Sequence, residues 1–283
     1  MEEKVLYQKN GNIVNQHIVS IEDRAFLYGD GCFTTARLKA GEIMLWERHL
    51  HRLQQAVTAL RMNCDIDCIK KDKDRFLKHL ANNATGTIKI VVSRGESQRG
   101  YALPNQTADI YFYYYPVSNH LTHPVILEKV GIIAETLASS FAPLKGIKTL
   151  NRLEQIMLKS MAMQQQWDEA LCFDAEQNLV EGISSNCFVF IDGIWHTPDL
   201  QCTGIDGIMR REILARMRYY QIPHQVRMIG KSEIPQIDAG FLCNALHPMH
   251  IMGQLMLDQD IVQSLDRQKC LQLFDLLQLK ELV

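Results

Sequence analysis

The sequence predicts an α+β protein of two domains, a small N-terminal α/β sandwich and a larger, barrel-like C-terminal β domain with flanking helices. Its 283 residues are enough for two ordinary domains. Helix-like and strand-like segments follow one another along the chain, and 47% of the residues are hydrophobic, which is typical of globular proteins. A polar, proline-ended stretch at residues 117–124 is predicted to link a domain of residues 1–116 to one of residues 125–283.

The N-terminal domain is predicted to contain a hairpin, two long helices and several strands. Residues 4–8 and 13–14 flank an Asn-Gly pair, which favours a hairpin with a tight turn. A serine ahead of a carboxylate at residues 20–24 indicates a short capped helical turn. Apolar residues recur at helical spacing in residues 46–62, at Leu50, Leu53, Val57 and Leu60. We also expect a charged helix at 69–82 and strands at 28–37, 86–95 and 109–115.

The C-terminal domain is predicted to be richer in strands. Turns at residues 176–178 and 192–193 connect consecutive strand-like segments, which favours an antiparallel-rich sheet or barrel. Three helices are expected to flank it, at residues 152–166, 208–220 and 264–277. Strands are expected at residues 130–134, 169–173, 179–181, 187–191 and 241–244.

Composition and charge argue against several classes of protein. Thirty Lys and Arg against thirty-two Asp and Glu give a net charge of −2, which does not indicate a nucleic-acid or membrane partner. No apolar run approaches the roughly 20 residues that span a bilayer. The acidic, polar N-terminus predicts no signal peptide. Eight cysteines without framework spacing predict free thiols in a reducing cytoplasm, and the close histidine pairs match no metal motif.

Lys148 is the first residue with a candidate chemical role. It follows a Lys-Gly-Ile turn and precedes the helix expected at residues 152–166. A lysine that is desolvated at such a junction can attack a carbonyl as a neutral amine and form a Schiff base. The alternative is a solvated loop lysine, which is the commoner situation for a single lysine.

Three further features complement this lysine. Glu181 ends an expected strand, where a buried carboxylate could keep a heteroaromatic nitrogen protonated. A glycine-bearing loop at residues 204–207 opens a helix whose backbone N–H groups could bind a phosphate. Arg52 lies on the first long helix and is suited to bidentate phosphate contact. Each feature has an ordinary solvent-exposed alternative, but together they match the aldehyde, ring nitrogen and phosphate of pyridoxal phosphate.

The sequence resembles the fold-type IV pyridoxal phosphate enzymes, which include branched-chain and D-amino acid aminotransferases. Within this family it is most similar to the aminodeoxychorismate lyases. The resembling segments follow the order of the family along almost the whole chain: residues 23–24 (DR), 28–37 (YGDGCFTTAR), 49–53 (HLHRL), 92–95 (VSRG), 99–101 (RGY), 146–155 (GIKTLNRLEQ), 206–210 (DGIMR) and 243–246 (CNAL).

The resemblance implies a role for each matching residue. Lys148 would be the Schiff-base lysine, whereas Lys145 falls outside the motif, and Glu181 would pair with the pyridine nitrogen. The phosphate would be held by Arg52, by the backbone of Ile208 and Met209, and by Asn244 and Ala245. The substrate of these lyases carries two carboxylates, so Arg94 and Arg99 are candidate cationic anchors, with solvated loop arginines as an equal alternative. Thr34, Thr35, Tyr101 and Arg152 are further candidate contacts. The resemblance also implies a homodimer, with the site between the two domains and loops of one subunit reaching the pocket of the other.

The implied reaction converts 4-amino-4-deoxychorismate to 4-aminobenzoate and pyruvate, a step of folate biosynthesis. The substrate amine would displace Lys148 to form an external aldimine, and the freed lysine would remove the proton from the adjacent ring carbon. Arg152 stands where the transaminases of the family usually have a tyrosine, which favours the lyase. Two alternatives stay open: a D-amino or branched-chain aminotransferase, and a dimeric binding protein without catalytic activity.

Overall fold

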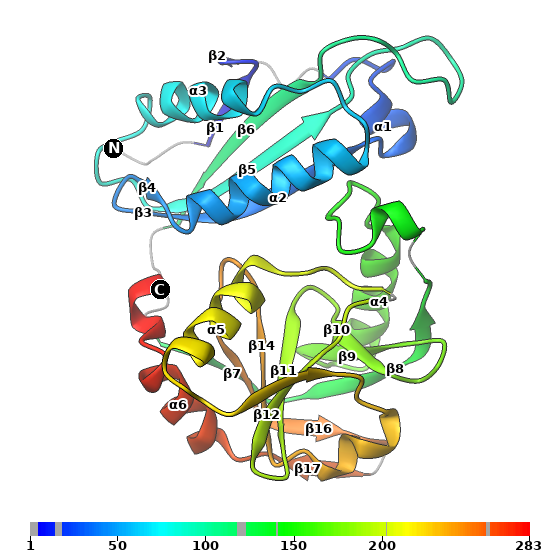
Figure 1. The fold of residues 1–283 in the computed structure, drawn as a ribbon, viewed down its shortest axis with the longest axis vertical. Helices are drawn as coiled ribbons and strands as arrows, with labels where there is room; N and C mark the ends of the chain where they lie inside the picture. Colours follow the sequence, from blue (N-terminus) through cyan, green and yellow to red (C-terminus); the bar gives the residue numbers. More distant parts are fainter. Residues whose placement is uncertain (1–4, 15–18, 118–122, 140, 202, 259–260) are drawn as a thin grey trace. The chain divides into compact units, whose positions relative to one another are not determined.

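The computed structural model describes residues 5–14, 19–117, 123–139, 141–201, 203–258 and 261–283. The chain forms two compact units, which we describe separately (Figure 1). Unit 1 comprises residues 1–120 with 147–151, and unit 2 comprises residues 121–146 with 152–283. The linker expected at residues 117–124 falls largely outside the described residues, so the domain boundaries inferred from the sequence stay a prediction.

Unit 1 is built on an antiparallel sheet of six strands in the order β2-β1-β6-β5-β3-β4 (Figure 1). The expected hairpin is present, with Gln8 opposite Ile13. The long strands lie where β-branched and aromatic residues are concentrated. The strands are β1 (Leu6–Lys9), β2 (Asn12–Ile13), β3 (Gly31–Lys39), β4 (Glu42–Ile43), β5 (Gly86–Ser93) and β6 (Asp109–Pro116).

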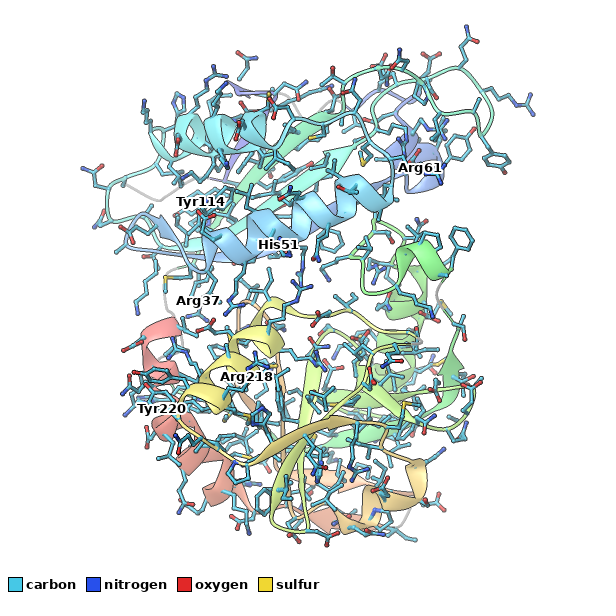
Figure 2. The ribbon with its side chains drawn as sticks, viewed as in Figure 1. Arg37, His51, Arg61, Tyr114, Arg218 and Tyr220 are labelled. Carbon is cyan, nitrogen blue, oxygen red and sulfur yellow. The ribbon has the colours of Figure 1, made fainter. Side chains whose placement is uncertain are left out.

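Two helices, α2 (Trp46–Ala59) and α3 (Ile66–Leu77), cover one face of this sheet (Figure 1). Even-numbered residues of β3, β5 and β6 point into the core beneath the helices, because side chains alternate along a strand. Tyr114, labelled in Figure 2, is one of them, and its hydroxyl donates to Thr85 O at 3.1 Å. Odd-numbered residues of the same strands therefore lie on the opposite face, which becomes important for the site.

Two helix starts in unit 1 differ from those expected. The helical turn expected at residues 20–24 is instead α1 (Arg24–Tyr28), because the cap is Asp23, whose Oδ1 accepts from Ala25 N at 2.8 Å. Helix α3 begins at Ile66, ahead of the expected residue 69, because Asp65 caps it by accepting from Asp67 N at 2.9 Å. The expected ranges therefore missed aspartate caps that stand directly before each helix.

Unit 2 contains a five-stranded sheet in the order β10-β9-β8-β16-β17 and a six-stranded sheet in the order β13-β12-β11-β14-β15-β7. One buried cluster draws residues from both sheets, among them Leu171 and Leu242, so the sheets pack face to face as in a barrel. The strands are β7 (Val125–Leu127), β8 (Val130–Leu137), β9 (Glu169–Asp174), β10 (Leu179–Gly182), β11 (Asn186–Ile191), β12 (Ile194–Pro198), β13 (His224–Arg227), β14 (Ala239–Cys243), β15 (His250–Met252), β16 (Gln254–Met256) and β17 (Val262–Ser264).

The described strands of unit 2 form five antiparallel and four parallel pairs, and its helices account for two of the parallel ones. Helix α4 (Leu153–Gln164) connects β8 to β9 and α5 (Ile208–Tyr219) connects β12 to β13, and both strand pairs are parallel. Parallel neighbours need such a crossover, whereas a tight turn joins only antiparallel ones. Helix α6 (Arg267–Leu276) and three short 3₁₀ segments complete the unit: η1 (Ala142–Leu144), η2 (Lys231–Gln236) and η3 (Leu279–Leu282). In the described part of the chain, no helix combines the length and the apolar character needed to cross a membrane.

Candidate active site

Lys148 belongs to unit 1, on a segment at residues 147–151 that pairs with the start of β3. Phe33 N donates to Lys148 O at 3.1 Å, which fixes the lysine backbone. A Cβ at Gly31 would lie 2.7 Å from Leu150 Cδ1, so glycine permits this close approach. The Lys148 side chain is half-buried, and its Nζ lies 4.5 Å from the centroid of the Phe33 ring.

A second lysine, Lys89, lies against the same ring and was missed in the sequence. Its Nζ is 5.1 Å from the Phe33 centroid, and it stands opposite Thr35 in the sheet. Burial lowers the pKa of Lys89, and none of the described residues forms an ion pair with it. A half-buried ammonium of this kind is a candidate anchor for an anionic ligand. The available signal was a lysine interrupting an apolar strand, on the face away from the helices.

Arg52 and Thr34 both lie near His49 of α2 in unit 1. Arg52 is buried on α2, and the hydroxyl of the fully buried Thr34 lies 2.7 Å from His49 Nδ1. Burial, reinforced by the charge of Arg52, lowers the pKa of His49 to about 3, so the imidazole is neutral. This burial leaves Thr34 without access to a ligand. Thr35 is half-buried and shares the opposite face with Phe33, so it is the better candidate for substrate contact.

Arg94 was expected to bind a substrate carboxylate, but its guanidinium is engaged inside unit 1. The side chain is buried, and its Nε donates to Asp30 Oδ2 at 2.7 Å. Its Nη1 and Nη2 donate to Arg61 O at 3.1 Å and to Leu60 O at 2.6 Å. These contacts favour a structural role for Arg94 over binding of a substrate carboxylate.

Arg99 and Tyr101 are both exposed, on a loop that follows β5. Arg99 lines a pocket of about 530 Å³ in unit 1 together with Leu27 and Tyr28. The ring of Tyr101 lies 5.6 Å from that of Tyr28 and is 85% exposed. Both side chains are therefore free to meet a ligand, in contrast to Arg94.

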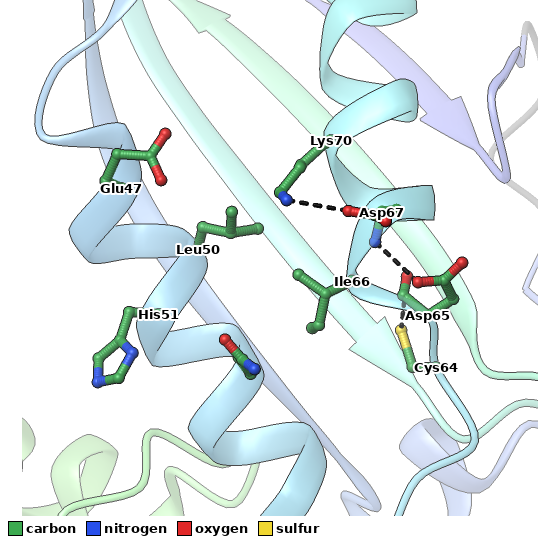
Figure 3. Close-up of a pocket in the computed structure, with 9 residues that line it drawn as sticks. Glu47, Leu50, His51, Cys64, Asp65, Ile66, Asp67 and Lys70 are labelled. Atoms are coloured by element: carbon green, nitrogen blue, oxygen red, sulfur yellow. Dashed lines mark hydrogen bonds and ion pairs between the residues drawn. The ribbon is translucent and has the colours of Figure 1, made fainter.

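Another pocket of about 530 Å³ lies between α2 and α3 and contains none of the expected site residues (Figure 3). Figure 3 shows that polar groups on the α3 side of this pocket are bonded to each other: Lys70 Nζ donates to Asp67 Oδ1 at 2.9 Å, and Asp67 N donates to Asp65. Across the described residues, no cluster of three or more His, Cys, Asp or Glu could hold a metal ion.

Glu181 lies in unit 2, on β10, where its carboxylate is buried. Its Oε2 accepts from Ile205 N at 3.0 Å and from Asn186 Nδ2 at 3.3 Å. Asn186 Nδ2 also donates to Ile205 O at 2.7 Å, so one amide joins the glutamate to the loop before α5. These two neutral donors fix the carboxylate beside the loop before α5.

The start of α5 has the features of an anion site. Gly207 is its N-cap, no side chain caps the helix, and its first turn contains no acidic residue. Ile208 and Met209, expected to bind phosphate through their N–H groups, are buried in this turn. A Cβ at Gly207 would lie 1.9 Å from Asn186 Oδ1, so only glycine fits beside the amide that holds Glu181.

Arg152, Asn244 and Ala245, the remaining residues expected at the site, also belong to unit 2. Arg152 is half-buried, and burial lowers its pKa while the nearby charges of Glu181 and Glu154 partly oppose the shift. Asn244 Oδ1 accepts from His247 N at 3.0 Å, and Asn244 and Ala245 are both half-buried. Lys145, the other lysine near the motif, is exposed.

The residues present suit pyridoxal phosphate. Glu181 is a buried carboxylate of the kind that pairs with a ring nitrogen, and α5 offers an N-terminus without a side-chain cap to a phosphate. Unit 1 contains Lys148, an amine held against an aromatic ring.

Comparison with known proteins gives a consistent result. The sequence model of the family described as amino-transferase class IV matches residues 31–252. The chain is 27% identical over 241 residues to an aminodeoxychorismate lyase of Vibrio harveyi, covering 83% of this chain and 86% of the relative. It is 24% identical over 245 residues to a D-alanine aminotransferase of Bacillus licheniformis, covering 84% and 83%. The crystal structure of 4-amino-4-deoxychorismate lyase from Pseudomonas aeruginosa is similar with a TM-score of 0.84 and 29% identity, covering 98% of each chain.

The residues matched by the family model include Lys148, Glu181, Arg52 and the start of α5, and they extend over most of both units. The chain therefore belongs to the class IV aminotransferase family.

Proposed function

We propose that this protein is a lyase that uses pyridoxal phosphate to convert 4-amino-4-deoxychorismate to 4-aminobenzoate and pyruvate, a step of folate biosynthesis. The observation that carries the proposal is the pair of lysines on the ring of Phe33: Lys148 as nucleophile and base, and Lys89 as an anchor for an anion. A dicarboxylate substrate needs such a cation near the reacting amine. Similarity to two lyases over most of the chain supports the same reaction.

Several residues would hold the cofactor. Lys148 would bind it covalently through Nζ, and Glu181 would pair with its ring nitrogen. Arg52, the N–H groups of Ile208 and Met209, and the segment Asn244 with Ala245 would bind its phosphate. When bound, pyridoxal phosphate supplies a sink for the electrons left behind when a proton is removed. Glu181 favours this, because a buried carboxylate stabilises a positive charge on its partner nitrogen.

The chain supplies the proton transfer and the substrate contacts. Once the substrate amine has displaced it from the cofactor, the free amine of Lys148 removes the proton from the amine-bearing ring carbon. The bond to the enolpyruvyl oxygen then breaks, the ring becomes aromatic, and Nζ returns a proton to the departing group to give pyruvate. Lys89 binds one substrate carboxylate and Arg99 the other. Thr35, Tyr101 and Arg152 are the further candidate substrate contacts.

Absorbance and product analysis test this proposal. The purified protein, supplied with pyridoxal phosphate, should show the visible band of lysine-bound cofactor, and Lys148→Ala should lose it. Addition of 4-amino-4-deoxychorismate should give 4-aminobenzoate with the wild type alone. Lys145→Ala is the matched control, because this lysine is close in sequence but exposed, and it should keep both band and product. Absence of the band in wild-type protein would refute the assignment.

An aminotransferase is the second candidate, favoured by the 24% identity to a D-alanine aminotransferase. It would use the same lysine and the same carboxylate, so cofactor binding does not distinguish the two. The lyase needs no keto acid, whereas a transaminase turns over only with an amino group acceptor. Release of 4-aminobenzoate without any added keto acid would identify the protein as a lyase. Turnover of D-alanine with 2-oxoglutarate, without any formation of 4-aminobenzoate, would identify it as an aminotransferase.

We further propose that the protein is a homodimer located in the cytoplasm. Unit 1 exposes large apolar side chains in two segments of the chain: Ile21 and Phe26 at the start of the domain, and Tyr101 and Leu103 in the loop after β5, are each more than half exposed. Light scattering should give twice the 32.5 kDa mass of the chain, and Phe26→Asp should weaken the association. The seven cysteines in the described residues are free thiols, in keeping with a reducing compartment.

A further inference from the structure

Asp30 lies between two buried arginines in unit 1, and the mechanism above uses none of the three. Its Oδ2 accepts from Arg24 Nε at 2.8 Å and from Arg94 Nε at 2.7 Å. The side chains of Arg24, Arg94 and Asp30 are only 4%, 5% and 13% exposed. Burial by itself raises the pKa of Asp30, but the hydrogen bonds and charges of Arg94 and Arg24 outweigh it and hold that pKa below its ordinary value.

One arm of this cluster reaches the end of a helix. Arg94 Nη2 and Nη1 donate to Leu60 O and Arg61 O, directly after the last turn of α2, and Arg61 is labelled there in Figure 2. The carbonyl of Leu60, the C-cap of α2, carries part of the negative charge of the helix C-terminus, which a guanidinium stabilises. Gln106 Nε2 also donates to Arg94 O at 3.0 Å. The Arg94 side chain is therefore held in one position by hydrogen bonds to Asp30 and to the end of α2.

The other arm reaches the loop at residues 96–101, which we call the Arg99 loop. Arg24 Nη1 donates to Ser97 Oγ at 3.1 Å and to Gly100 O at 2.9 Å. Its guanidinium lies 5.0 Å from the ring of Tyr28, whose hydroxyl accepts from Gly100 N at 3.4 Å. Glycine allows the left-handed φ of +117° at position 100.

The Arg99 loop is thus held largely by side chains rather than by a strand ladder. Beyond an isolated bridge between Asp23 and Glu96, its described backbone takes part in no sheet. Removing the guanidinium of Arg24, or the carboxylate that orients it, would weaken the hold on the loop at Ser97 and at Gly100 together. The bonds that remain there are the longer ones, from Ser97 N to Glu22 O and from Gly100 N to the Tyr28 hydroxyl, both at 3.4 Å. A loop that must be ordered before it can bind loses affinity by the cost of that ordering.

We propose that Asp30, with Arg24 and Arg94, is a positioning cluster that preorganises the Arg99 loop and so presents Arg99 and Tyr101 to a carboxylate of the substrate. This inference rests on the proposed function for the identity of the ligand. The three residues do not touch substrate or cofactor; they act through the loop. The cluster would therefore control substrate affinity more than the rate of the chemical step.

Two variants test the cluster, with one matched control. Asp30→Asn removes the charge that joins the two arginines. Arg24→Lys keeps a cation for Asp30 but cannot reach Ser97 and Gly100 at the same time. The control Glu212→Gln removes a carboxylate of the same 13% exposure from its arginine, Arg216, on α5 and away from the loop in sequence.

Limited trypsin digestion of the holoenzyme measures loop order without using activity. The bond after Arg99 is followed by Gly100, and the bond after the exposed Lys145 is followed by Gly146, so Lys145 is an internal reference. In both variants, we expect cleavage after Arg99 to accelerate at least about tenfold relative to cleavage after Lys145, since proteolysis follows the open population of a loop. The control should leave this ratio unchanged.

Steady-state kinetics on the same proteins give the second readout. KM for 4-amino-4-deoxychorismate should rise about tenfold in both variants, with kcat within about threefold of wild type and the cofactor band retained. Equal cleavage ratios in variant and control, or losses of kcat without a change in KM, would overturn the inference. If wild-type protein forms no 4-aminobenzoate, the proposed function fails, while the cleavage ratio still decides whether the cluster orders the loop.

Discussion

Replacement of Lys89 by methionine is the sharpest test of how the site binds its substrate. The change removes the ammonium and keeps an unbranched stem of similar length on the same face of β5. A hydrogen bond to a charged group contributes roughly 1.5–3 kcal/mol, which corresponds to an increase in KM of about tenfold to 150-fold. Because Lys89 is half-exposed, we expect the lower part of that range, about tenfold to thirtyfold. The assay is 4-aminobenzoate formation at varied substrate concentration.

Stability separates this binding role from a structural one. Burial lowers the pKa of Lys89, so the folded protein disfavours the charged form, and its removal should leave the melting temperature unchanged or raise it. Lys9→Met is the matched control: Lys9 Nζ also lies over an aromatic ring of the same sheet, 5.3 Å from the Tyr111 centroid, but pairs with Asp109 at 2.8 Å. Lys89→Arg should restore binding. An unchanged KM in Lys89→Met, or an equal rise in Lys9→Met, would refute the reasoning.

Three further outcomes follow from unit 2 and from the core of unit 1. Gly207→Ala should lower the free energy of unfolding by at least about 2 kcal/mol, because the new Cβ would lie 1.9 Å from Asn186 Oδ1. Gly230→Ala is the control and should be nearly neutral, because a Cβ at Gly230 has its nearest contact at 3.6 Å. Urea titration measures both. Glu181→Gln should keep the bound cofactor but lower kcat at least about a hundredfold, since a neutral amide stabilises a protonated ring nitrogen poorly, and rapid product assays check it. In the folded protein His49 stays neutral, because its pKa is lowered to about 3, whereas in the unfolded chain it takes up a proton near pH 6.5. The free energy of unfolding should therefore fall as the pH drops from about 7 toward 3, and His49→Gln should make that dependence shallower.

The elements that could be predicted from the sequence are those with a strong local signal. Helix α2 was recognised because Leu50, Leu53 and Val57 repeat at helical spacing, and the structure buries all three. Strands β5 and β6 consist mostly of β-branched and aromatic residues and were placed within a few positions. In each case the residues that mark the element also make its core.

The elements that were missed lack such a signal. Strands β7 and β15 have three residues each, too few for any periodicity, and they pair in parallel although more than a hundred residues separate them in sequence. Their pairing depends on the rest of unit 2 rather than on their own residues. The same holds for the parallel partners of β12 and β8, which are set by the crossover helices.

The site residues were also predicted only in part. The sequence shows which residues are arginines, but not whether a given arginine binds a ligand or stabilises the fold. Arg94 and Arg99 lie five positions apart in one loop motif, yet Arg94 is buried against Asp30 and Arg99 is exposed at a pocket. Lys89 was overlooked because a lysine within a strand is usually a solvated one.

The alternation of side chains along β3 explains why neighbouring residues of one motif lie on opposite faces of the sheet. Thr34 and Thr35 are adjacent and chemically identical, but side chains alternate along a strand, so one faces His49 beneath α2 and the other shares the face of Phe33. The register then puts Lys89 opposite Thr35 and brings Lys148 to the same aromatic ring. A single-residue slip of β3 against β5 would reverse every one of these assignments and bury Phe33 in place of Thr34. The many buried apolar residues on the even-numbered face oppose that slip, so the packing of the helices on the sheet also fixes which lysine can meet the substrate.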